Sequence, residues 1–176
     1  MIVDILGPEL LSTERLVLRE FTSASAPLLV ELDSDPEVMH FITGGKPTPP
    51  NEIEDDYLPA FLAYYVREHG YGFWAAELRT TGEFLGWFHL RPPPGAPVDE
   101  PELGYRLVRS AWGRGLAAEG SRALVDYAFT RCAAARVVAE TMAVHTASRR
   151  VMEKCGMSLV RTFHADWPHP IPGDEH

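Results

Sequence analysis

The amino-acid sequence predicts a single mixed α/β domain. The chain has 176 residues, of which 45% are hydrophobic and 23% are charged, close to the average of soluble globular domains. Short segments with alternating apolar residues, typical of strands, are interleaved with segments whose apolar residues recur at helical spacing. Their order along the chain, β-α-α-α-β-β-β-α-β-α-β, indicates a layered fold of helices and strands.

The N-terminal third is predicted to hold one strand and three helices. Residues 14–21 alternate apolar and charged side chains, as in a half-buried strand. Two short helical patterns follow in residues 24–43 and are separated near Pro36, because proline does not continue a helix. After a loop rich in glycine and proline, Asn51 is expected to cap a longer helix that extends to about His69.

The middle of the chain is predicted to form three strands. Residues 73–78 and 83–90 are apolar runs joined by a turn at 80–82, as in a β-hairpin. A proline-stiffened loop over residues 91–97 then leads to a third alternating run at 101–108. These runs supply the centre of the expected sheet.

The C-terminal part is predicted to contain two helices, each followed by a strand. The first helix begins after a glycine-containing turn. Residues 136–142 are rich in β-branched side chains and indicate a buried strand. The second helix, with Thr146 or Ser148 near its start and Gly156 just after its end, leads into an alternating strand at 157–163.

The turn that opens the first of these helices, Trp112-Gly113-Arg114-Gly115, has the features of an anion-binding site. Glycine lets backbone N–H groups crowd around one point, and the start of a helix carries partial positive charge. Arg114 adds a formal charge, so the expected ligand is a phosphate group. The turn is neither a Walker loop nor a Gly-x-Gly-x-x-Gly dinucleotide fingerprint. Taken alone, the motif also fits a plain strand-to-helix turn.

Charge and composition limit the classes of protein to which this chain can belong. The net charge of −9 and the isoelectric point near 5.2 argue against a nonspecific nucleic-acid binder, which needs a basic surface. An acidic cleft would attract a cationic acceptor, although acidity also serves solubility. No signal peptide or membrane-spanning run is visible, and Cys132 and Cys155 lack metal-ligand spacing. We expect a cytoplasmic protein with no bound metal and no membrane partner.

Two segments together resemble the signature motifs of the GNAT family of N-acetyltransferases. The glycine turn is similar to the family's Gln/Arg-x-x-Gly-x-Gly/Ala loop, and residues 145–157 are similar to its Asn-x-x-Ser-x-x-x-x-Glu-Lys-x-Gly-Phe stretch. Residues 11–19 resemble the start of the RimJ/RimL-like enzymes, which acetylate ribosomal-protein N-termini. With residues 87–90 and 102–105, the likeness covers roughly residues 10–165.

The resemblance implies a mostly antiparallel central sheet flanked by helices, with acetyl-CoA as cosubstrate and an amine as acceptor. The whole chain, 1–176, is expected to be one acetyltransferase domain, with residues 1–10 as an N-terminal extension and 164–176 as a proline-rich tail. The residues expected to bind the cosubstrate are Leu107, Val108, Trp112, Gly113, Arg114, Gly115, Leu116, Ala117, Ala118, His145 and Ser148.

Three positions depart from the family pattern. Trp112 stands where Gln or Arg is common, which leaves the pyrophosphate to Arg114 and the backbone amides. His145 replaces the Asn of the second motif, and Met152 stands where many members carry a tyrosine acid. Because methionine cannot donate a proton, an acid of that kind is excluded at this position.

Acetyl transfer to an amine requires a group that removes the ammonium proton, since only about one alkyl amine in 10³ is unprotonated at pH 7. Glu102 is the first candidate for this base, because some family members place a Glu at the corresponding strand position, and Glu140 is the second. A solvated or ion-paired carboxylate is the alternative for each. His89 is expected either to relay a proton with Glu102 or to be a core histidine.

Two further candidates lie near the expected position of the leaving thiolate. Ser148 matches the Ser of the second motif and is expected to stabilise the sulfur by a hydrogen bond, or only to cap its helix. His145 is expected to contact pantetheine or donate a proton, or only to lie on a surface loop. Both are therefore counted with Glu102 and Glu140 as catalytic candidates.

The predicted function is acetyl-CoA-dependent transfer of an acetyl group to a primary amine. The acceptor is either a protein N-terminus or a small molecule such as a polyamine, an aminoglycoside or an amino-acid analogue. The alternative is a non-catalytic acyl-CoA-binding module that uses the same anion site without an acid or base.

The final strand of the family fold is expected to be missing. Pro168, Pro170 and Pro172 cannot donate ladder hydrogen bonds, and no apolar run follows residues 157–163. An unpaired sheet edge is a liability in water. We expect this edge to be covered by the tail, by residues 1–10 or by a second subunit, with a homodimer as the preferred arrangement.

Overall fold

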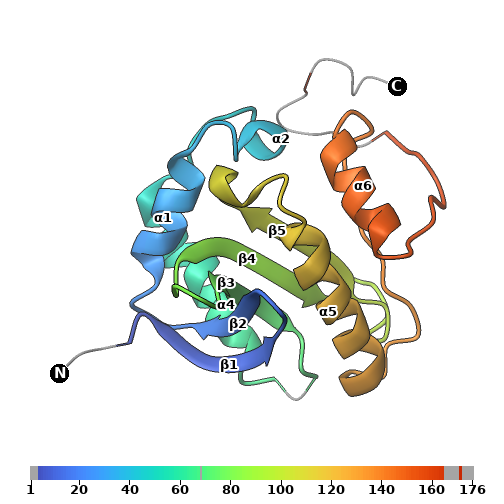
Figure 1. The fold of residues 1–176 in the computed structure, drawn as a ribbon, viewed down its shortest axis with the longest axis horizontal. Helices are drawn as coiled ribbons and strands as arrows, with labels where there is room; N and C mark the ends of the chain where they lie inside the picture. The colour runs from blue at the N-terminus through green and yellow to red at the C-terminus, as the bar shows by residue number, and fades with distance from the viewer. Residues whose placement is uncertain (1–3, 68, 165–170, 172–176) are drawn as a thin grey trace.

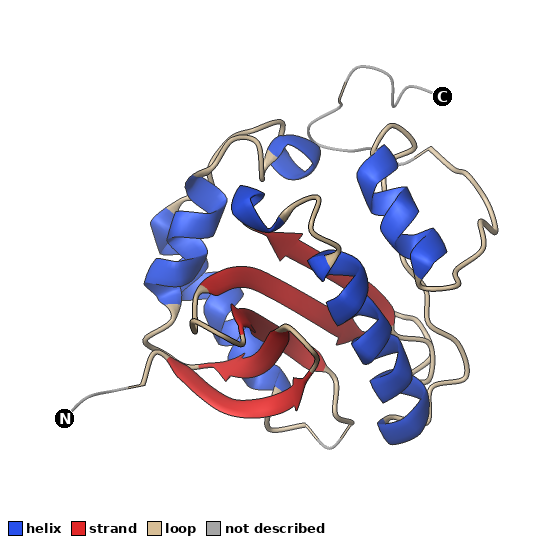
Figure 2. Ribbon diagram, viewed as in Figure 1, coloured by secondary structure: helices blue, strands red, loops and turns tan. Residues whose placement is uncertain are grey.

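The computed structural model describes residues 4–67, 69–164 and 171, and these form one antiparallel sheet flanked by helices (Figures 1 and 2). The sheet order is β1-β2-β3-β4-β5, and every neighbouring pair is antiparallel. The strands are β1 (Leu6–Ser12), β2 (Leu16–Phe21), β3 (Gly72–Leu78), β4 (Phe84–Arg91) and β5 (Glu102–Leu107). The predicted mixed α/β fold with a mostly antiparallel sheet is confirmed.

The helices lie on both faces of this sheet. They are α1 (Ala26–Ser34), α2 (His40–Thr43), α3 (Pro50–Glu52), the π-helical η1 (Ile53–Tyr57), α4 (Leu58–Tyr64), the 3₁₀-helical η2 (Arg109–Ala111), α5 (Leu116–Arg131) and α6 (Thr146–Lys154). α5 crosses the face that is toward the viewer in Figure 1, and α4 lies behind the sheet. No helix in the described ranges is long and apolar enough to cross a bilayer.

Alternation of side chains divides the core into two apolar clusters, one on each face of the sheet. The cluster under α5 includes Phe88 and Leu103 from the sheet with Leu116 and Leu124 from the helix. α5 comes close to the sheet because Gly120 has no side chain: a Cβ there would overlap the Phe88 ring. The cluster on the other face joins Phe21, Phe73 and Trp87 to Leu29, Ile53 and Phe61 from the helices.

The N-terminal segment differs from the expectation. Residues 1–10 were predicted to be an extension, but Leu6–Ser12 form β1, which pairs with β2 at the edge of the sheet. Gly7 and Pro8 argue against a strand when the sequence is considered alone, but an edge strand tolerates a residue that cannot donate a hydrogen bond. β2 begins at Leu16 rather than at residue 14.

The helical segment before β3 is also built differently. Asn51 is not the N-cap: it lies inside α3, which starts at Pro50 because proline fits the first turn of a helix. The helix does not continue to His69 but ends at Tyr64. In η1 the Leu58 amide bonds to the Ile53 oxygen, five residues back. Pro59 follows directly, and its missing N–H accounts for a break in the regular α-helical ladder.

Two predicted strands near the C-terminus do not form. Residues 136–142 contribute only one parallel bridge, between Val138 and Glu102, because the apolar run is short and Glu140 is exposed. Residues 157–163 form no strand, and Leu159 and Val160 are 78% and 87% exposed. The neighbouring strand predicted at residues 136–142, on which this segment would pair, does not form beyond one bridge.

The expected absence of a final strand stays a prediction, because it concerns residues 164–176, of which only 164 and 171 are described. The predictions for Pro168, Pro170 and Pro172 fall outside the described residues. Ile171, which is described, is buried at 6% exposure. The helices predicted in residues 24–43, the 80–82 turn and the helices after the glycine turn and around Ser148 are confirmed.

Candidate active site

The outer edge of β5 is open along the half that leads to the glycine turn. The Leu103 amide donates to the Val138 oxygen at 2.8 Å, so the backbone groups of Leu103 point away from β4. Backbone groups alternate in direction along a strand, so those of Tyr105 and Leu107 point the same way. In the described residues, β5 has no partner on this side beyond the bridge between Glu102 and Val138. An extended ligand with amide groups can therefore pair here as a strand would.

The glycine turn has the backbone conformation that the sequence predicts. Gly113 and Gly115 have φ angles of 70° and 78°, in the left-handed region that favours glycine. Gly115 is the N-cap of α5, and the Glu119 amide donates to the Gly115 oxygen at 3.0 Å. The amides of residues 116–118 come before this bond, at the end of the helix where N–H groups lack intrahelical acceptors. They form a site suited to an anion.

The side chains around the turn fix its position rather than fill it. The Trp112 indole donates to the Leu107 oxygen at 2.9 Å, and the Val108 amide donates to the Leu85 oxygen at 2.9 Å. Arg114 is exposed and donates to the Ser110 oxygen at 3.3 Å. In the first turn of α5, Leu116 and Ala118 are buried and Ala117 is half-buried. These three residues therefore offer an anion their amide groups, not their side chains.

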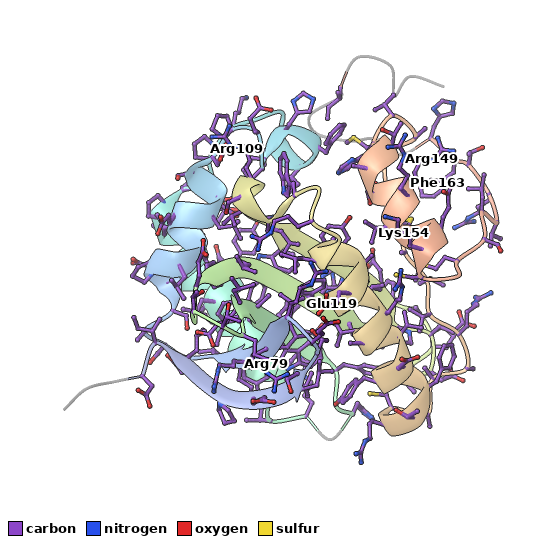
Figure 3. The ribbon with its side chains drawn as sticks, viewed as in Figure 1. Arg79, Arg109, Glu119, Arg149, Lys154 and Phe163 are labelled. Carbon is purple, nitrogen blue, oxygen red and sulfur yellow. The ribbon has the colours of Figure 1, made fainter. Side chains whose placement is uncertain are left out.

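An ion pair that sequence reasoning missed holds the turn against the sheet. Arg15, just before β2, pairs with Glu119 of α5 at 2.7 Å, and its Nη1 donates to the Arg114 oxygen at 2.9 Å. Glu119 also accepts hydrogen bonds from the Thr13 hydroxyl and the Arg15 amide, at 2.6 and 2.8 Å. Figure 3 shows Glu119 near the start of α5. Both Thr13 and Arg15 belong to the 11–19 stretch, so the motif itself was visible in the sequence.

Replacing Glu119 with Gln is expected to lower the Tm at pH 7 by about 2–4 °C and to weaken coenzyme A binding. Burial alone would raise the pKa of Glu119, but hydrogen bonds from Thr13 and Arg15 and the charge of Arg15 lower it below 4.5. A carboxyl group with a lowered pKa stabilises the fold at pH values above its ordinary pKa. This stabilisation is lost as the pH falls through the lowered pKa. Thermal melts of both proteins should therefore converge at acidic pH.

The matched control is Glu77→Gln. Glu77 pairs with Arg19 at 2.9 Å between β3 and β2, away from the glycine turn. Both variants should lose stability, but only Glu119→Gln should raise the Kd for coenzyme A in calorimetry. Equal Kd values for the two variants would show that the Arg15–Glu119 pair does not position the turn.

The structure brings the two candidate bases to the same end of β5. Glu102 is the first residue of β5 and stands opposite Arg91 of β4. Glu140 follows the Val138 bridge and is exposed, and its negative charge is near enough to affect the pKa of Glu102. Burial raises the pKa of Glu102, Glu140 raises it further, and Arg91 opposes the shift. A carboxylate with a raised pKa is a better proton acceptor at neutral pH.

Ser148 and His145 lie on the other side of the open edge, at the start of α6. Ser148 interacts with the phenol of Tyr105. Burial raises the pKa of Tyr105, and the contact with Ser148 offsets part of this rise. Tyr105 was quoted in the family motif but not predicted as a site residue. His145 is the N-cap of α6, without a side-chain capping bond, and its ring stacks on Phe41 at 3.9 Å. Burial and the charge of His40 lower the pKa of His145, which favours its neutral form.

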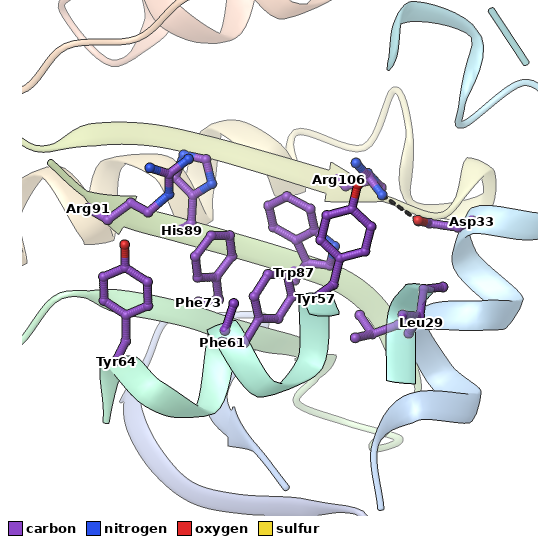
Figure 4. A pocket seen from close by; sticks show the side chains of 12 residues that line it. Leu29, Asp33, Tyr57, Phe61, Tyr64, Phe73, Trp87, His89, Arg91 and Arg106 are labelled. Carbon is purple, nitrogen blue, oxygen red and sulfur yellow. Dashed lines mark hydrogen bonds and ion pairs between the residues drawn. The ribbon is translucent and has the colours of Figure 1, made fainter. Parts of the chain in front are cut away.

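A cavity of about 350 Å³ lies on the sheet face opposite α5 (Figure 4). Trp87, His89 and Arg91 of β4 enter it from the sheet, with Phe73 of β3 and Arg106 of β5. Tyr57, Phe61 and Tyr64 close it from the helices. Sequence reasoning missed Asp33 and Arg106, whose ion pair joins α1 to β5 at 2.5 Å.

The expected proton relay through His89 is not supported by its surroundings. Burial and the charges of Arg91 and Arg106 lower the pKa of His89 to about 3. Both ring nitrogens are buried without a hydrogen-bond partner in the described structure. His89 therefore stays neutral at physiological pH, so it can donate one hydrogen bond to a ligand and accept one but does not take up a second proton.

The described residues contain no group of three or more His, Cys, Asp or Glu side chains placed to hold a metal ion.

Comparison with known proteins places this site in a family. Residues 15–158 match the model of the acetyltransferase (GNAT) domain. An FsC-acetyl coenzyme A-N(2)-transacetylase of Aspergillus fumigatus is 35% identical over 174 residues, which cover 94% of this chain and 72% of that relative. The chain belongs to the GNAT family of acetyltransferases and is an N-acetyltransferase.

Solved structures share the fold. RimL, a ribosomal-protein alpha-N-acetyltransferase solved with coenzyme A, has a TM-score of 0.70 at 17% identity, with 84% of this chain and 82% of that chain covered. The aminoglycoside acetyltransferase AAC(6')-Ib, also solved with coenzyme A, has a TM-score of 0.69 at 20% identity, with 87% and 88% covered. One fold thus serves a protein acceptor and an aminoglycoside acceptor, so the fold does not choose the acceptor.

Proposed function

We propose that this chain transfers the acetyl group of acetyl-CoA to a primary amine at the open edge of β5. The observation that carries the proposal is the arrangement along this edge: the glycine turn lies at one end and Glu102 at the other. The amides of residues 113–118 would hold the pyrophosphate, and the outward-facing backbone groups of Tyr105 and the Leu107 amide would pair with the amides of pantetheine, because the Leu107 oxygen already accepts from the Trp112 indole. In this arrangement the thioester would lie toward Glu102.

The reaction needs one proton acceptor and a stabilised leaving group. Glu102 would take the ammonium proton, directly or through a water, so that the amine nitrogen can attack the thioester carbonyl. A backbone N–H at the open edge of β5 would hydrogen-bond the oxyanion. As the carbon–sulfur bond breaks, the Ser148 hydroxyl, backed by Tyr105, would stabilise the thiolate. Glu140 remains the second candidate base and His145 a candidate contact of pantetheine.

The test is an assay of coenzyme A release with acetyl-CoA and a panel of amines that includes N-terminal peptides, polyamines, aminoglycosides and amino acids. Turnover with at least one amine, lost on Glu102→Gln, supports the proposal. Coenzyme A binding without turnover on any amine would support the alternative, a non-catalytic acyl-CoA-binding module.

The finer assignments from the sequence stay predictions. Residues 11–19 favour the RimJ/RimL-like subgroup, and their Thr13 and Arg15 brace the glycine turn. The absence of a nucleic-acid partner and a cytoplasmic location are expected from the acidic charge and the lack of a visible signal. A homodimer is favoured by the exposed Leu159, Val160 and Phe163 after α6.

A further inference from the structure

The cavity opposite α5 contains polar atoms that the protein itself leaves unmatched. Both ring nitrogens of His89 and the Nε of Arg106 are buried and have no hydrogen-bond partner among the described residues. Arg91 lines the same cavity and forms no ion pair there, although its guanidinium lies 5.6 Å from the centre of the Phe73 ring. Buried polar groups are normally paired, so these atoms indicate a ligand.

The kind of ligand follows from the donors and acceptors on offer. Arg91 and Arg106 can only donate hydrogen bonds, which calls for oxygen acceptors on the ligand. Neutral His89 offers one donor and one acceptor, and its acceptor nitrogen suits the N–H of an amine. The remaining lining residues are aromatic or aliphatic, among them Tyr57, Phe61, Tyr64, Phe73 and Trp87.

The charge of the cavity is positive, although the chain carries a net charge of −9. Asp33 is the one carboxylate among the described residues that line it, and Arg106 pairs with it at 2.5 Å. The Thr48 hydroxyl donates to the same carboxylate at 2.6 Å, so the Asp33 carboxylate already has two partners and attracts a further cation only weakly. Arg91 has no carboxylate partner among the lining residues, and Glu102, opposite it on β5, acts on it from outside the lining. Polycations such as polyamines and aminoglycosides are disfavoured by the positive charge of the lining.

His89 connects the lining of the cavity to β5, because its ring lies against Gly104. His89 of β4 stands opposite Gly104, and a Cβ on Gly104 would lie 2.7 Å from the imidazole. The missing side chain makes room for the imidazole, so His89 lies over β5 between the rest of the cavity and the edge where the thioester would lie. Glu102, two residues earlier on β5, lies on the same face of the sheet as His89 and Arg91.

We propose that the acceptor is a small amino acid with an apolar or aromatic side chain, whose carboxylate pairs with Arg91 and whose amine passes His89 toward Glu102. The assignment rests on the proposed function, since it takes the cavity as the acceptor side of that reaction. Arg91 and His89 are two residues apart on β4, which sets their side chains about 6.6–6.8 Å apart. This span fits a carboxylate and an amine joined through one carbon, each with its hydrogen bond.

The experiment compares acceptors that differ only in the carboxylate. Phenylalanine is paired with 2-phenylethylamine and leucine with 3-methylbutylamine, and spermidine and kanamycin represent polycations. Coenzyme A release gives kcat/KM for each, and calorimetry in the presence of coenzyme A gives binding without turnover. The amino acid of each pair is expected to be favoured by about 10–100-fold, the effect of one charge-assisted contact.

Variants assign the preference to Arg91. Arg91→Gln should remove the preference within each pair, and Arg91→Lys, which keeps the charge, should restore part of it. The matched control is Arg67→Gln, because Arg67 also lies over an aromatic ring, that of Tyr64 at 4.5 Å, but does not line this cavity. Arg67→Gln should leave the preference unchanged.

The outcomes separate this proposal from the proposed function. Binding of phenylalanine or leucine that depends on Arg91, without any coenzyme A release, would support the cavity assignment and defeat the transfer reaction. Transfer to spermidine or kanamycin, with no binding or turnover of either amino acid, would do the reverse. Equal kcat/KM within the pairs, or a preference that survives Arg91→Gln, overturns the proposal.

Discussion

Replacing Glu102 with Gln is expected to lower turnover with any amine acceptor by about 10²–10⁴-fold, the usual contribution of a positioned general base. Glutamine keeps the size of the side chain but cannot accept the ammonium proton. Because the glycine turn lies at the far end of β5, the affinity for coenzyme A should not change. Steady-state kinetics and calorimetry on the two proteins measure both effects.

The pH dependence gives a sharper form of this prediction. Burial raises the pKa of Glu102 above 4.5, so the carboxyl stays protonated, and inactive as a base, to a higher pH than an ordinary glutamate. The kcat/KM of the wild-type enzyme should therefore fall on the acidic side with a midpoint above that value, and Glu102→Gln should lack this limb. A raised pKa also means that ionisation costs folding free energy at neutral pH, so the variant should be at least as stable at pH 7.

Glu140→Gln is the matched control, since Glu140 lies near Glu102 but is exposed. It should leave the acidic limb in place and shift its midpoint slightly downward, because one negative charge near Glu102 is removed. If Glu140→Gln loses the limb and Glu102→Gln keeps it, the base is Glu140.

Replacing Gly115 with Val is expected to raise the Kd for coenzyme A at least about tenfold. Gly115 has a φ of 78°, which costs a residue with a Cβ about 1–2 kcal/mol, and most for a β-branched side chain. Its Cβ would meet only Arg15 Nη2, at an ordinary 3.5 Å, so the protein itself does not exclude the side chain. The loss should instead come from displaced amides in residues 116–118 and from occupied phosphate space.

Gly82→Val separates strain from binding. Gly82, in the turn between β3 and β4, has a φ of 71° and no heavy atom within 4 Å of the position of a Cβ. The two variants should lose similar stability in thermal melts, but only Gly115→Val should weaken coenzyme A in calorimetry. An unchanged Kd in Gly115→Val would remove the pyrophosphate from this turn.

The elements that the sequence predicted well are those with a local signal. The alternation of β3, β4 and β5 and the turn at 80–82 depend on neighbouring residues, and so does the glycine turn before α5. β1 was missed because Gly7 and Pro8 argue against a strand, whereas its position at the sheet edge makes them tolerable. Residues 136–142 have strand-forming side chains, but pairing depends on a partner edge that only the folded chain defines.

The same difference between local and long-range signals decides which parts of the candidate site could be predicted. Glu102 and the glycine turn were found because they lie on one continuous stretch of chain. The Arg15–Glu119 pair joins residues 104 positions apart, and Arg106 reaches Asp33 across 73 positions. No spacing rule relates such residues. The unmatched nitrogens of His89 are likewise a property of packing, visible only when the neighbours of the ring are known.

The outer edge of β5 is unpaired over only a short length. Between the bridge at Glu102 and the turn, the outward backbone groups are those of Tyr105 and Leu107, and the Leu107 oxygen already accepts from the Trp112 indole. This stretch is too short to hold a strand from another protein chain firmly. A pantetheine arm, with its two amides, has about the length and the hydrogen-bonding groups of so short a segment. The protein can thus leave its sheet incomplete for a small molecule to finish, with little risk that a neighbouring polypeptide takes the same place.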